Sequence, residues 1–216
     1  METLSEITEK IHQNLESRMH ARDKALTRAR QLTRHSAHTI RAIHRNEQET
    51  TDLELSQAKT LVDELKTSLS EFPELYFSGY TQDAIKEFAE ASITRALILN
   101  QTLPSPQDLG VEDATYLNGL AEANGELRRR CLDILRQGYS QEAERLLGCM
   151  DDIYGVLVTM DYPDAITNGL RRQTDIVRSL LERTRGDLTL SLREEQLKQA
   201  LTDSITKLTA YSKDNA

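Results

Sequence analysis

The chain has 216 residues and a formal net charge of −8, with 38% hydrophobic and 29% charged residues. Nine Gly and four Pro provide little turn chemistry for a β protein, so the composition favours amphipathic helices. The sequence shows no apolar run of membrane-spanning length and nothing that resembles a signal peptide. We therefore expect a cytoplasmic protein without a membrane partner, in which Cys131 and Cys149 stay reduced.

The first predicted helix covers residues 3–45, where apolar residues recur at helical spacing and neither Gly nor Pro interrupts. At 1.5 Å per residue this helix is about 60 Å long. A compact domain of this chain length is roughly 34 Å across. A helix that extends beyond its own domain needs a partner to cover its apolar stripe, so the sequence predicts an oligomer.

Six further helices are predicted, separated by breaks that contain Pro, Gly or Asp. They cover residues 52–69, 81–100 with Thr81 as the N-cap, 112–137, the segment after Ser140, 165–185 and 188–211. Gly186 and Asp187 are interpreted as the end of one helix and the start of the next, and residues 212–216 are interpreted as a frayed tail. No strand and no repeat is predicted. Residues 1–216 are thus expected to form one all-α domain, a bundle of roughly seven helices.

Basic residues are concentrated in the first helix. Between Arg18 and Arg45 the chain carries eight Lys or Arg and one acid, Asp23, which indicates a surface for a polyanion. Helical periodicity places five side chains on one arc beside the apolar face, where they would line a groove between helices: Arg30, Arg34, His38, Arg41 and Arg45. We call these residues the basic row.

Guanidinium groups offer a bidentate fork for phosphates, so the basic row is a candidate site for nucleic-acid backbone. The alternative is a solvated helix face that is balanced by acids of another helix. The five histidines of the chain are predicted to be polar or hydrogen-bonding residues rather than metal ligands, because no acid or Cys is placed to complete a site.

Two pairs of acids stand at helical spacing. Glu87 and Glu90 lie three residues apart in the helix predicted at 81–100, with no basic residue on the same arc. Glu122 and Glu126 lie four residues apart in the next long helix. Carboxylates held this close repel each other unless they share a proton or a cation, and Mg²⁺ is the hard cation that carboxylates bind best. The alternative is that each pair is an ordinary solvated helix face.

Gly119 and Gly125 stand on either side of Glu122. A Gly inside a helix costs about 1 kcal/mol relative to Ala, so two of them suggest the close approach of another backbone. If that backbone belongs to the helix at 81–100, four carboxylates converge on one small site. No phosphate-binding loop, HExxH motif or recognisable nucleophile competes with this site in the sequence.

Nine stretches across nearly the whole chain share the order and spacing of one known family. They are residues 22–26, 40–45, 72–76, 79–80, 86–91 (KEFAEA), 116–127 (YLNGLAEANGEL), 161–164, 169–172 and 184–188. Through these stretches the chain resembles the translin family, in particular its translin-associated factor X (TRAX) branch in microbial form.

The resemblance implies a translin-type helical fold that assembles into a hollow homo-octamer with nucleic acid in its basic interior. TRAX-like subunits resemble endoribonucleases that use Mg²⁺ or Mn²⁺, which makes RNA the expected partner. Glu87 and Glu90 match the acids of the family's E-x-x-E segment. Glu122 and Glu126 match its D-x-x-x-E segment, with Glu122 in place of Asp, so that one extra methylene separates this carboxylate from the helix.

Three hypotheses follow. The first is a metal-dependent endoribonuclease with Glu87, Glu90, Glu122 and Glu126 as catalytic and metal-binding residues and the basic row as its nucleic-acid site, with Arg129 a weaker candidate for stabilising transition-state charge. The second is a translin-like assembly that binds RNA or single-stranded DNA without cleaving it. The third is a helical scaffold whose basic row pairs across a subunit interface.

Overall fold

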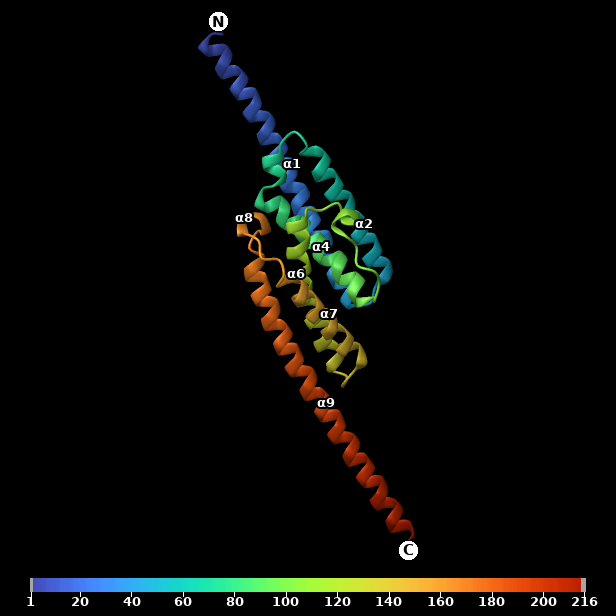
Figure 1. Cartoon of the computed structure of the whole chain (residues 1–216). Coiled ribbons are helices and arrows are strands. Elements are labelled where there is room, and N and C mark those ends of the chain that lie inside the picture. Colours follow the sequence, from blue (N-terminus) through green and yellow to red (C-terminus); the bar gives the residue numbers. More distant parts are fainter. Residues whose placement is uncertain (1, 215–216) are drawn as a thin grey trace.

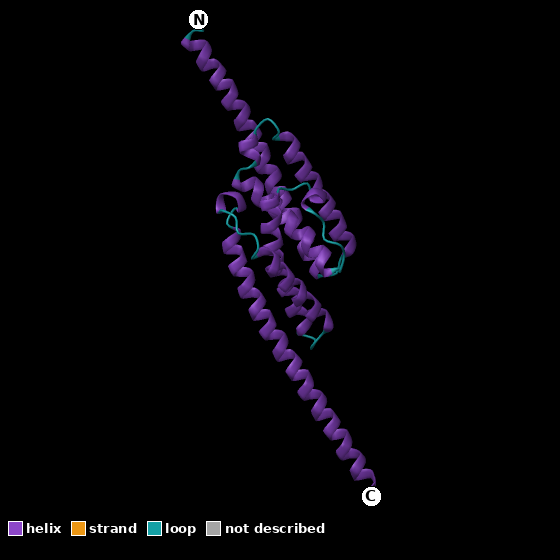
Figure 2. Cartoon of the chain, in the orientation of Figure 1, coloured by secondary structure: helices purple, strands orange, loops and turns teal. Residues whose placement is uncertain are grey.

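The computed structural model describes residues 2–214, and the side chains of residues 2–211. All regular structure in this part of the chain is helical (Figure 2). Six helices are long: α1 (Leu4–His44), α2 (Gln48–Ser68), α4 (Gly79–Ile98), α6 (Asp113–Leu135), α7 (Gln141–Leu157) and α9 (Leu170–Asp214). Three are single turns in the connections: α3 (Pro73–Tyr76), α5 (Pro106–Leu109) and α8 (Asp164–Thr167). The prediction of an all-α bundle is confirmed.

Helix α4 is the central element of the body. It packs against α1 and α2 on one side and against α6 on the other, and α6 in turn packs against α7 and α9 (Figure 1). Apolar side chains of α4 such as Ile85, Phe88 and Ile93 are almost completely buried. A helix that is covered on several sides is apolar around most of its circumference, so the few charged groups of α4 that face inward are conspicuous.

Two helices extend beyond this body in opposite directions (Figure 1). Residues 4–20 of α1 are exposed on every side, although a capping box between Thr3 and Glu6 closes the first turn. Residues 196–211 of α9 are exposed in the same way. The predicted long N-terminal helix is thus present, and α9 is a second helix of this kind.

The predicted break at Gly186 and Asp187 is wrong, because α9 runs through both residues. Thr184 and Leu188 are buried on either side of this point, and the Asp187 carboxylate lies 2.8 Å from the Arg128 guanidinium on α6. Packing and this ion pair outweigh the helix cost of one Gly, which is about 1 kcal/mol. The chain reverses earlier instead, at Asn168 and the following Gly, which both have positive φ.

Other helix ends differ from the predictions by a few residues. Helix α4 begins at Gly79 with Ser78 as the N-cap, and the predicted cap Thr81 is buried and donates its hydroxyl to the Leu75 carbonyl at 2.8 Å. Residues 212–214 belong to α9 rather than to a frayed tail, while residues 215–216 of that tail lie outside the described part. Within residues 2–214, no helix combines the length and apolar character that a membrane span requires.

Candidate carboxylate site and basic face

Helices α4 and α6 approach each other closely at Gly119. A Cβ at this position would lie 3.0 Å from the Ala89 Cβ, the Glu90 amide nitrogen and the Lys86 carbonyl oxygen. Two of these three atoms are backbone, which cannot move aside without moving α4. The prediction of a close backbone approach is therefore confirmed for Gly119, whereas Gly125 has no neighbour within 4 Å of such a Cβ and the same prediction is wrong there.

This approach places Glu90 among the other three predicted carboxylates. Burial raises the pKa of Glu90 to about 8, and the negative charges of Glu122, Glu126 and Glu87 add to this effect. Burial also raises the pKa of Glu87, against the opposing effects of the Lys86 charge and of a hydrogen bond from Thr33 on α1. Glu90 thus holds a proton at neutral pH when no cation is near.

Glu122 is paired with a cation of the neighbouring helix. The Lys86 ammonium lies 2.8 Å from Glu122 Oε1, and the Gln173 amide of α9 donates to the same oxygen at 3.3 Å. Burial lowers the pKa of Lys86, but the hydrogen bond and negative charge of Glu122, with Asp83 and Glu87, outweigh burial and raise it. Lys86 therefore remains charged inside the cluster.

Glu126 is held by a histidine of α1. His44 Nε2 lies 2.5 Å from Glu126 Oε2, and this hydrogen bond is the largest influence that lowers the pKa of Glu126. The His44 side chain is only 4% exposed, and its Nδ1 atom is buried without a hydrogen-bond partner. Arg129, which is about half exposed, approaches the same carboxylate at 3.5 Å.

The structure brings the four predicted acids within electrostatic reach of one another, and it pairs Glu122 with Lys86 and Glu126 with His44. Within residues 2–211, no group of three or more His, Cys, Asp or Glu side chains is arranged to hold a metal ion. Sequence reasoning missed Lys86 and His44, which contact Glu122 and Glu126 from outside the helical arc that carries Glu87 and Glu90. The position of Lys86 next to Glu87 in the sequence could have indicated that it lies near the acids. His44 gives no such indication, because it is 82 positions from Glu126.

The chemistry of the cluster nevertheless suits a hard divalent cation. All four side chains offer carboxylate oxygens, which Mg²⁺ and Mn²⁺ prefer. Burial raises the pKa of Glu90 most, and the negative charges of Glu122, Glu126 and Glu87 raise it further, an excess of negative charge that Lys86 offsets only in part. A bound cation would remove this excess, so the residues fit such an ion in donor type and in charge.

The four arginines of the basic row are exposed, three of them on α1 and Arg45 at its C-cap. They lie on the side of the helix away from its buried residues, such as Leu32 and Ser36, so the predicted position beside the buried face is wrong. In the described part of the chain Arg30, Arg34 and Arg41 form no hydrogen bond or ion pair, and Arg45 lies 4.0 Å from Glu47, the residue before α2. Acids of other helices do not balance these three side chains.

The basic row and the carboxylate cluster are neighbours. Thr33 and His44, which contact Glu87 and Glu126, lie on the arc of α1 next to the arginines. The arginines of α1 that pair across helices stand earlier, with Arg18 3.0 Å from Glu74 and Arg28 2.9 Å from Glu64. The unpaired arginines of the described chain in α1 therefore lie in the same part of the helix as Thr33 and His44, which reach the acids.

His38, the fifth member of the basic row, is turned toward α2. Its Nδ1 lies 3.4 Å from Glu54 Oε1, and the other oxygen of Glu54 lies 2.6 Å from His35 Nδ1. Burial would raise the pKa of Glu54, but the two histidines together lower it. The prediction that histidines serve as hydrogen-bonding residues is confirmed for His35, His38 and His44.

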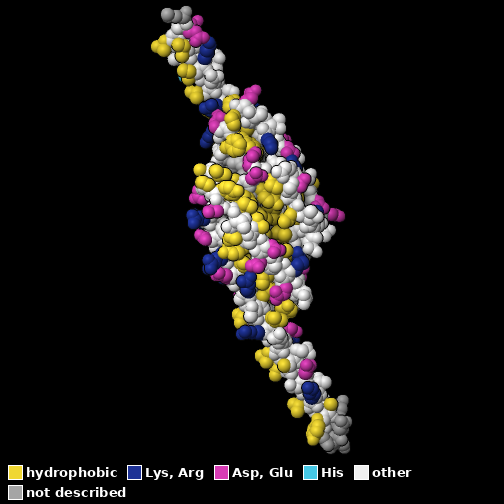
Figure 3. All heavy atoms as spheres, viewed as in Figure 1, with side chains coloured by type: hydrophobic (Ala, Val, Ile, Leu, Met, Phe, Trp, Pro, Cys, Tyr) yellow, Lys and Arg dark blue, Asp and Glu magenta, His cyan; other side chains and the backbone are white. Residues whose placement is uncertain are grey.

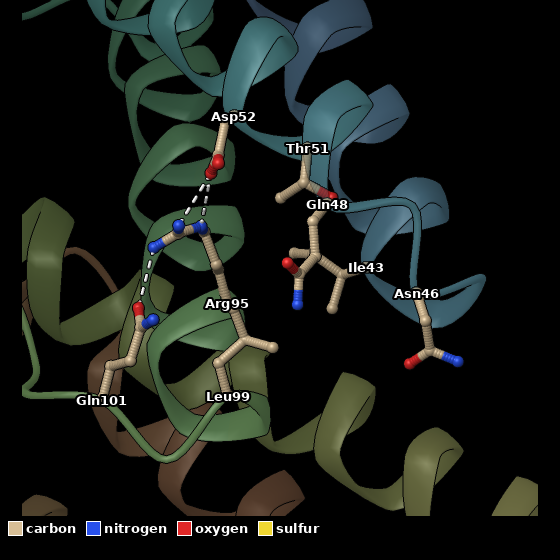
Figure 4. Close-up of a pocket in the computed structure, with 8 residues that line it drawn as sticks. All are labelled: Ile43, Asn46, Gln48, Thr51, Asp52, Arg95, Leu99 and Gln101. Atoms are coloured by element: carbon tan, nitrogen blue, oxygen red, sulfur yellow. Dashed lines mark hydrogen bonds and ion pairs between the residues drawn. The ribbon is translucent and has the colours of Figure 1, made fainter.

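A separate hollow of about 220 Å³ opens where α2 begins and α4 ends (Figure 4). Arg95 dominates it, and its guanidinium donates to Asp52 at 2.7 and 3.1 Å and to Gln101 at 2.9 Å. None of its lining residues belongs to the carboxylate cluster. Because its charges are paired with each other, this hollow offers no free charge to a substrate.

Comparisons with known proteins give relatives along most of the chain. An uncharacterised protein of Methanocaldococcus jannaschii is 33% identical over 183 residues, which cover 83% of this chain and 80% of the relative. Two solved structures of AfC3PO, one of them a complex with duplex RNA, are 34% identical and cover 87% of this chain and 97% of theirs, with TM-scores of 0.81 for the RNA complex and 0.80 for the other.

The structure of apo-NeC3PO is 20% identical, covers 88% of this chain and 98% of its own, and has a TM-score of 0.77, which shows a shared fold. No family model matches the chain.

Proposed function

This chain belongs to the translin family, to which the C3PO proteins also belong, and we propose that it binds RNA and cleaves its phosphodiester bonds with the help of a divalent cation. The carboxylate cluster between α4 and α6 is the proposed catalytic site, which makes the subunit TRAX-like. The observation that carries this proposal is the close approach of α4 and α6 at Gly119, which brings Glu90 within the electrostatic reach of Glu122 and Glu126; burial and these charges, with Glu87, raise the pKa of Glu90 to about 8.

RNA binding rests on the basic row. Arg30, Arg34 and Arg41 are exposed and unpaired in the described part of the chain, and such side chains bind backbone phosphates. A relative with 34% identity, AfC3PO, has been solved with duplex RNA. Because phosphate contacts release counterions, affinity for RNA should fall steeply with salt and depend little on sequence. Single-stranded DNA is a second ligand with the same phosphate chemistry.

The mechanism assigns a role to each group of side chains. Glu87, Glu90, Glu122 and Glu126 would hold Mg²⁺ or Mn²⁺, which when bound polarises a phosphate and acidifies a nearby water. The arginines would bind the phosphates of the RNA backbone and hold it along α1, beside the cluster. His44 fixes Glu126 through the hydrogen bond from Nε2. When a cation binds, Glu90 would release the proton that its raised pKa retains in the cation-free chain, and one of the four carboxylates would then accept the proton of the attacking water.

Substitution of Glu90 tests the catalytic site. Glu90→Gln keeps the shape of the side chain but removes its charge and basicity, so cleavage of RNA in Mg²⁺ should fall at least about 100-fold. RNA binding in EDTA should be unchanged, because the basic row is intact. The measurement is a gel-based cleavage assay together with a binding assay on the same protein.

The matched control is Glu71→Gln, an exposed acid between α2 and α3 that forms no hydrogen bond or ion pair with the described cluster residues. This control should cleave like the wild type. Wild-type cleavage rates in Glu90→Gln would show that the assigned site is wrong.

A second candidate function is RNA binding without cleavage. It is favoured by the pairing of Glu122 with Lys86 and of Glu126 with His44, which leaves no three ligand side chains converging on an ion within residues 2–211. This function predicts salt-sensitive RNA binding and intact RNA after incubation with Mg²⁺ or Mn²⁺. The same cleavage assay separates the two functions.

The proposal includes assembly into a homo-oligomer, with an octamer as the expected state. The exposed segments of α1 and α9 carry large apolar side chains that nothing in the described chain covers, and the space-filling view shows such side chains along both projections (Figure 3). They are Leu4, Ile7, Ile11, Leu15 and Met19 in α1, and Leu197, Leu201, Ile205 and Leu208 in α9. A monomer rarely exposes such a stripe.

A further inference from the structure

Lys86 is the one lysine in direct contact with the described carboxylate cluster. Its ammonium lies 2.8 Å from Glu122 Oε1, and the side chain is only 22% exposed. Its charge also opposes the rise in the pKa of Glu87 and of Glu90. Lys86 therefore stabilises the charged form of three of the four acids, Glu122, Glu87 and Glu90, as a bound cation would, although it carries a single charge.

Resting on the function proposed above, we propose that Lys86 is a tethered counter-ion, which neutralises Glu122 while no divalent cation is bound and leaves it when a divalent cation binds. The ammonium and the cation compete for the same carboxylate oxygen. A divalent cation and the ammonium at adjacent positions also repel each other, because charges are weakly screened at a partly buried site. Both cannot occupy the cluster together without this cost.

The structure provides a second position for the displaced ammonium. Asp83 lies one turn earlier on α4, its carboxylate is 3.8 Å from Lys86 Nζ, and its side chain is 73% exposed. The lysine stem has four rotatable carbons, so a small change of rotamer moves the charge from Glu122 to Asp83. The ammonium would then lie at the solvent edge of the cluster.

His44 contrasts with Lys86 in this respect. Its side chain is 4% exposed, its Nε2 is bonded to Glu126 and its Nδ1 has no partner, so it has no second position. We therefore assign the exchange to Lys86 alone and keep His44 as a fixed support of Glu126.

The binding experiment uses the full-length chain and Mn²⁺ alone, with free Mn²⁺ counted by electron paramagnetic resonance. Lys86→Gln removes the competing charge, so it should bind Mn²⁺ about tenfold more tightly than the wild type, or better. Lys59→Gln, which removes a lysine paired with Asp63 on α2, is the matched control and should bind like the wild type.

A labelling experiment on the wild-type chain tests the exchange without any variant. An amine-reactive acylating reagent should modify Lys86 slowly in EDTA and several-fold faster in Mg²⁺, because the displaced ammonium moves toward solvent. Lys59 should be labelled at the same rate in both conditions. Mass spectrometry of peptides gives the two rates, so the test stands even if Lys86→Gln does not fold.

The outcomes separate this inference from the proposed function. Equal Mn²⁺ affinity in the wild type and Lys86→Gln, with unchanged labelling of Lys86, would overturn the role of Lys86 and leave metal-dependent cleavage standing. If Lys86→Gln binds Mn²⁺ and the wild type does not, the Lys86 ammonium excludes Mn²⁺ from the wild-type cluster, which supports the inference. Absence of Mn²⁺ binding in both proteins would overturn the inference together with the metal-dependent function.

Discussion

At the residue scale, the negative charge of three acids in the cluster is compensated in three different ways. Glu122 is paired with Lys86, Glu126 is held by His44, and Glu90 retains a proton because burial and its neighbours raise its pKa to about 8. Buried carboxylates that lack a cation commonly protonate rather than stay charged. Ion pairing, hydrogen bonding and protonation thus limit the negative charge of the cation-free cluster.

The raised pKa of Glu90 predicts how stability depends on pH in EDTA. The folded chain binds the Glu90 proton up to a pH of about 8, whereas the unfolded chain releases it near 4.5. The contribution of Glu90 to stability is thus fully present below pH 4.5 and is lost as the pH rises toward 8. The free energy of unfolding of the wild type should fall over this range relative to that of Glu90→Gln.

Urea unfolding of both proteins at pH 5 and pH 8 measures this difference. Glu90→Gln cannot ionise at this position, so it should gain stability relative to the wild type at pH 8. A difference between the two proteins that is the same at both pH values would contradict the buried, protonated state of Glu90.

At the element scale, the contact between α4 and α6 decides whether a site exists. Gly119 lets the two backbones approach until the Glu90 amide nitrogen lies 3.0 Å from where a Cβ would stand. The acids project from both helices beside this contact. A larger separation would leave two ordinary carboxylate pairs on separate helix faces.

Substitution of Gly119 by Ala tests this contact. The added methyl meets backbone atoms of α4, and overpacking of this kind costs about 1–3 kcal/mol, against which Ala regains about 1 kcal/mol of helix propensity. We expect a net loss in the free energy of unfolding, together with a loss of RNA cleavage in Mg²⁺ because the helices move apart.

Gly125→Ala is the matched control, since the same helix is open at this position. It should be neutral or stabilise the fold by up to about 1 kcal/mol and should leave cleavage unchanged. Equal stability changes at the two glycines would show that the close approach at Gly119 does not constrain the packing of α4 on α6.

Helix α9 shows how packing overrides a local signal. Gly186 and Asp187 are poor helix residues, yet α9 continues because Thr184 and Leu188 are buried and Asp187 pairs with Arg128. The continuation carries the apolar side chains of α9 away from the body, where only another chain can cover them. A broken helix would have lost this projection.

At the scale of the whole molecule, the two projections leave from opposite ends of the body (Figure 1). Each has an apolar stripe and no cover in the described chain, so the subunit is incomplete as a monomer. The basic row lies between them on α1.

The projection of α1 predicts the effect of a charge on assembly. Ile11→Glu places a carboxylate in the exposed apolar stripe, so the oligomer should dissociate into smaller species, as measured by light scattering after size exclusion. Gln13→Glu adds the same charge on the opposite side of the same exposed segment and should leave the mass unchanged. An unchanged mass for Ile11→Glu would exclude this stripe from the interface.

The sequence by itself determined the helical class, the long N-terminal helix, the concentration of basic residues in it and the two acid pairs. These features are local, since a periodicity of 3.6 residues and the absence of Gly or Pro can be read along the chain. The helix ends, the interpretation of Gly186 and the position of the arginines opposite the buried face needed the structure, because packing decides which helix face is covered.

Only the tertiary structure decided what the acids do together. Glu126 meets His44 from 82 positions away, Glu122 meets Lys86 across two helices, and Gly119 sets the distance between those helices. The interaction between charges depends on their distance in space and on how deeply they are buried. Neither the distance nor the burial can be read from the spacing of residues along the chain.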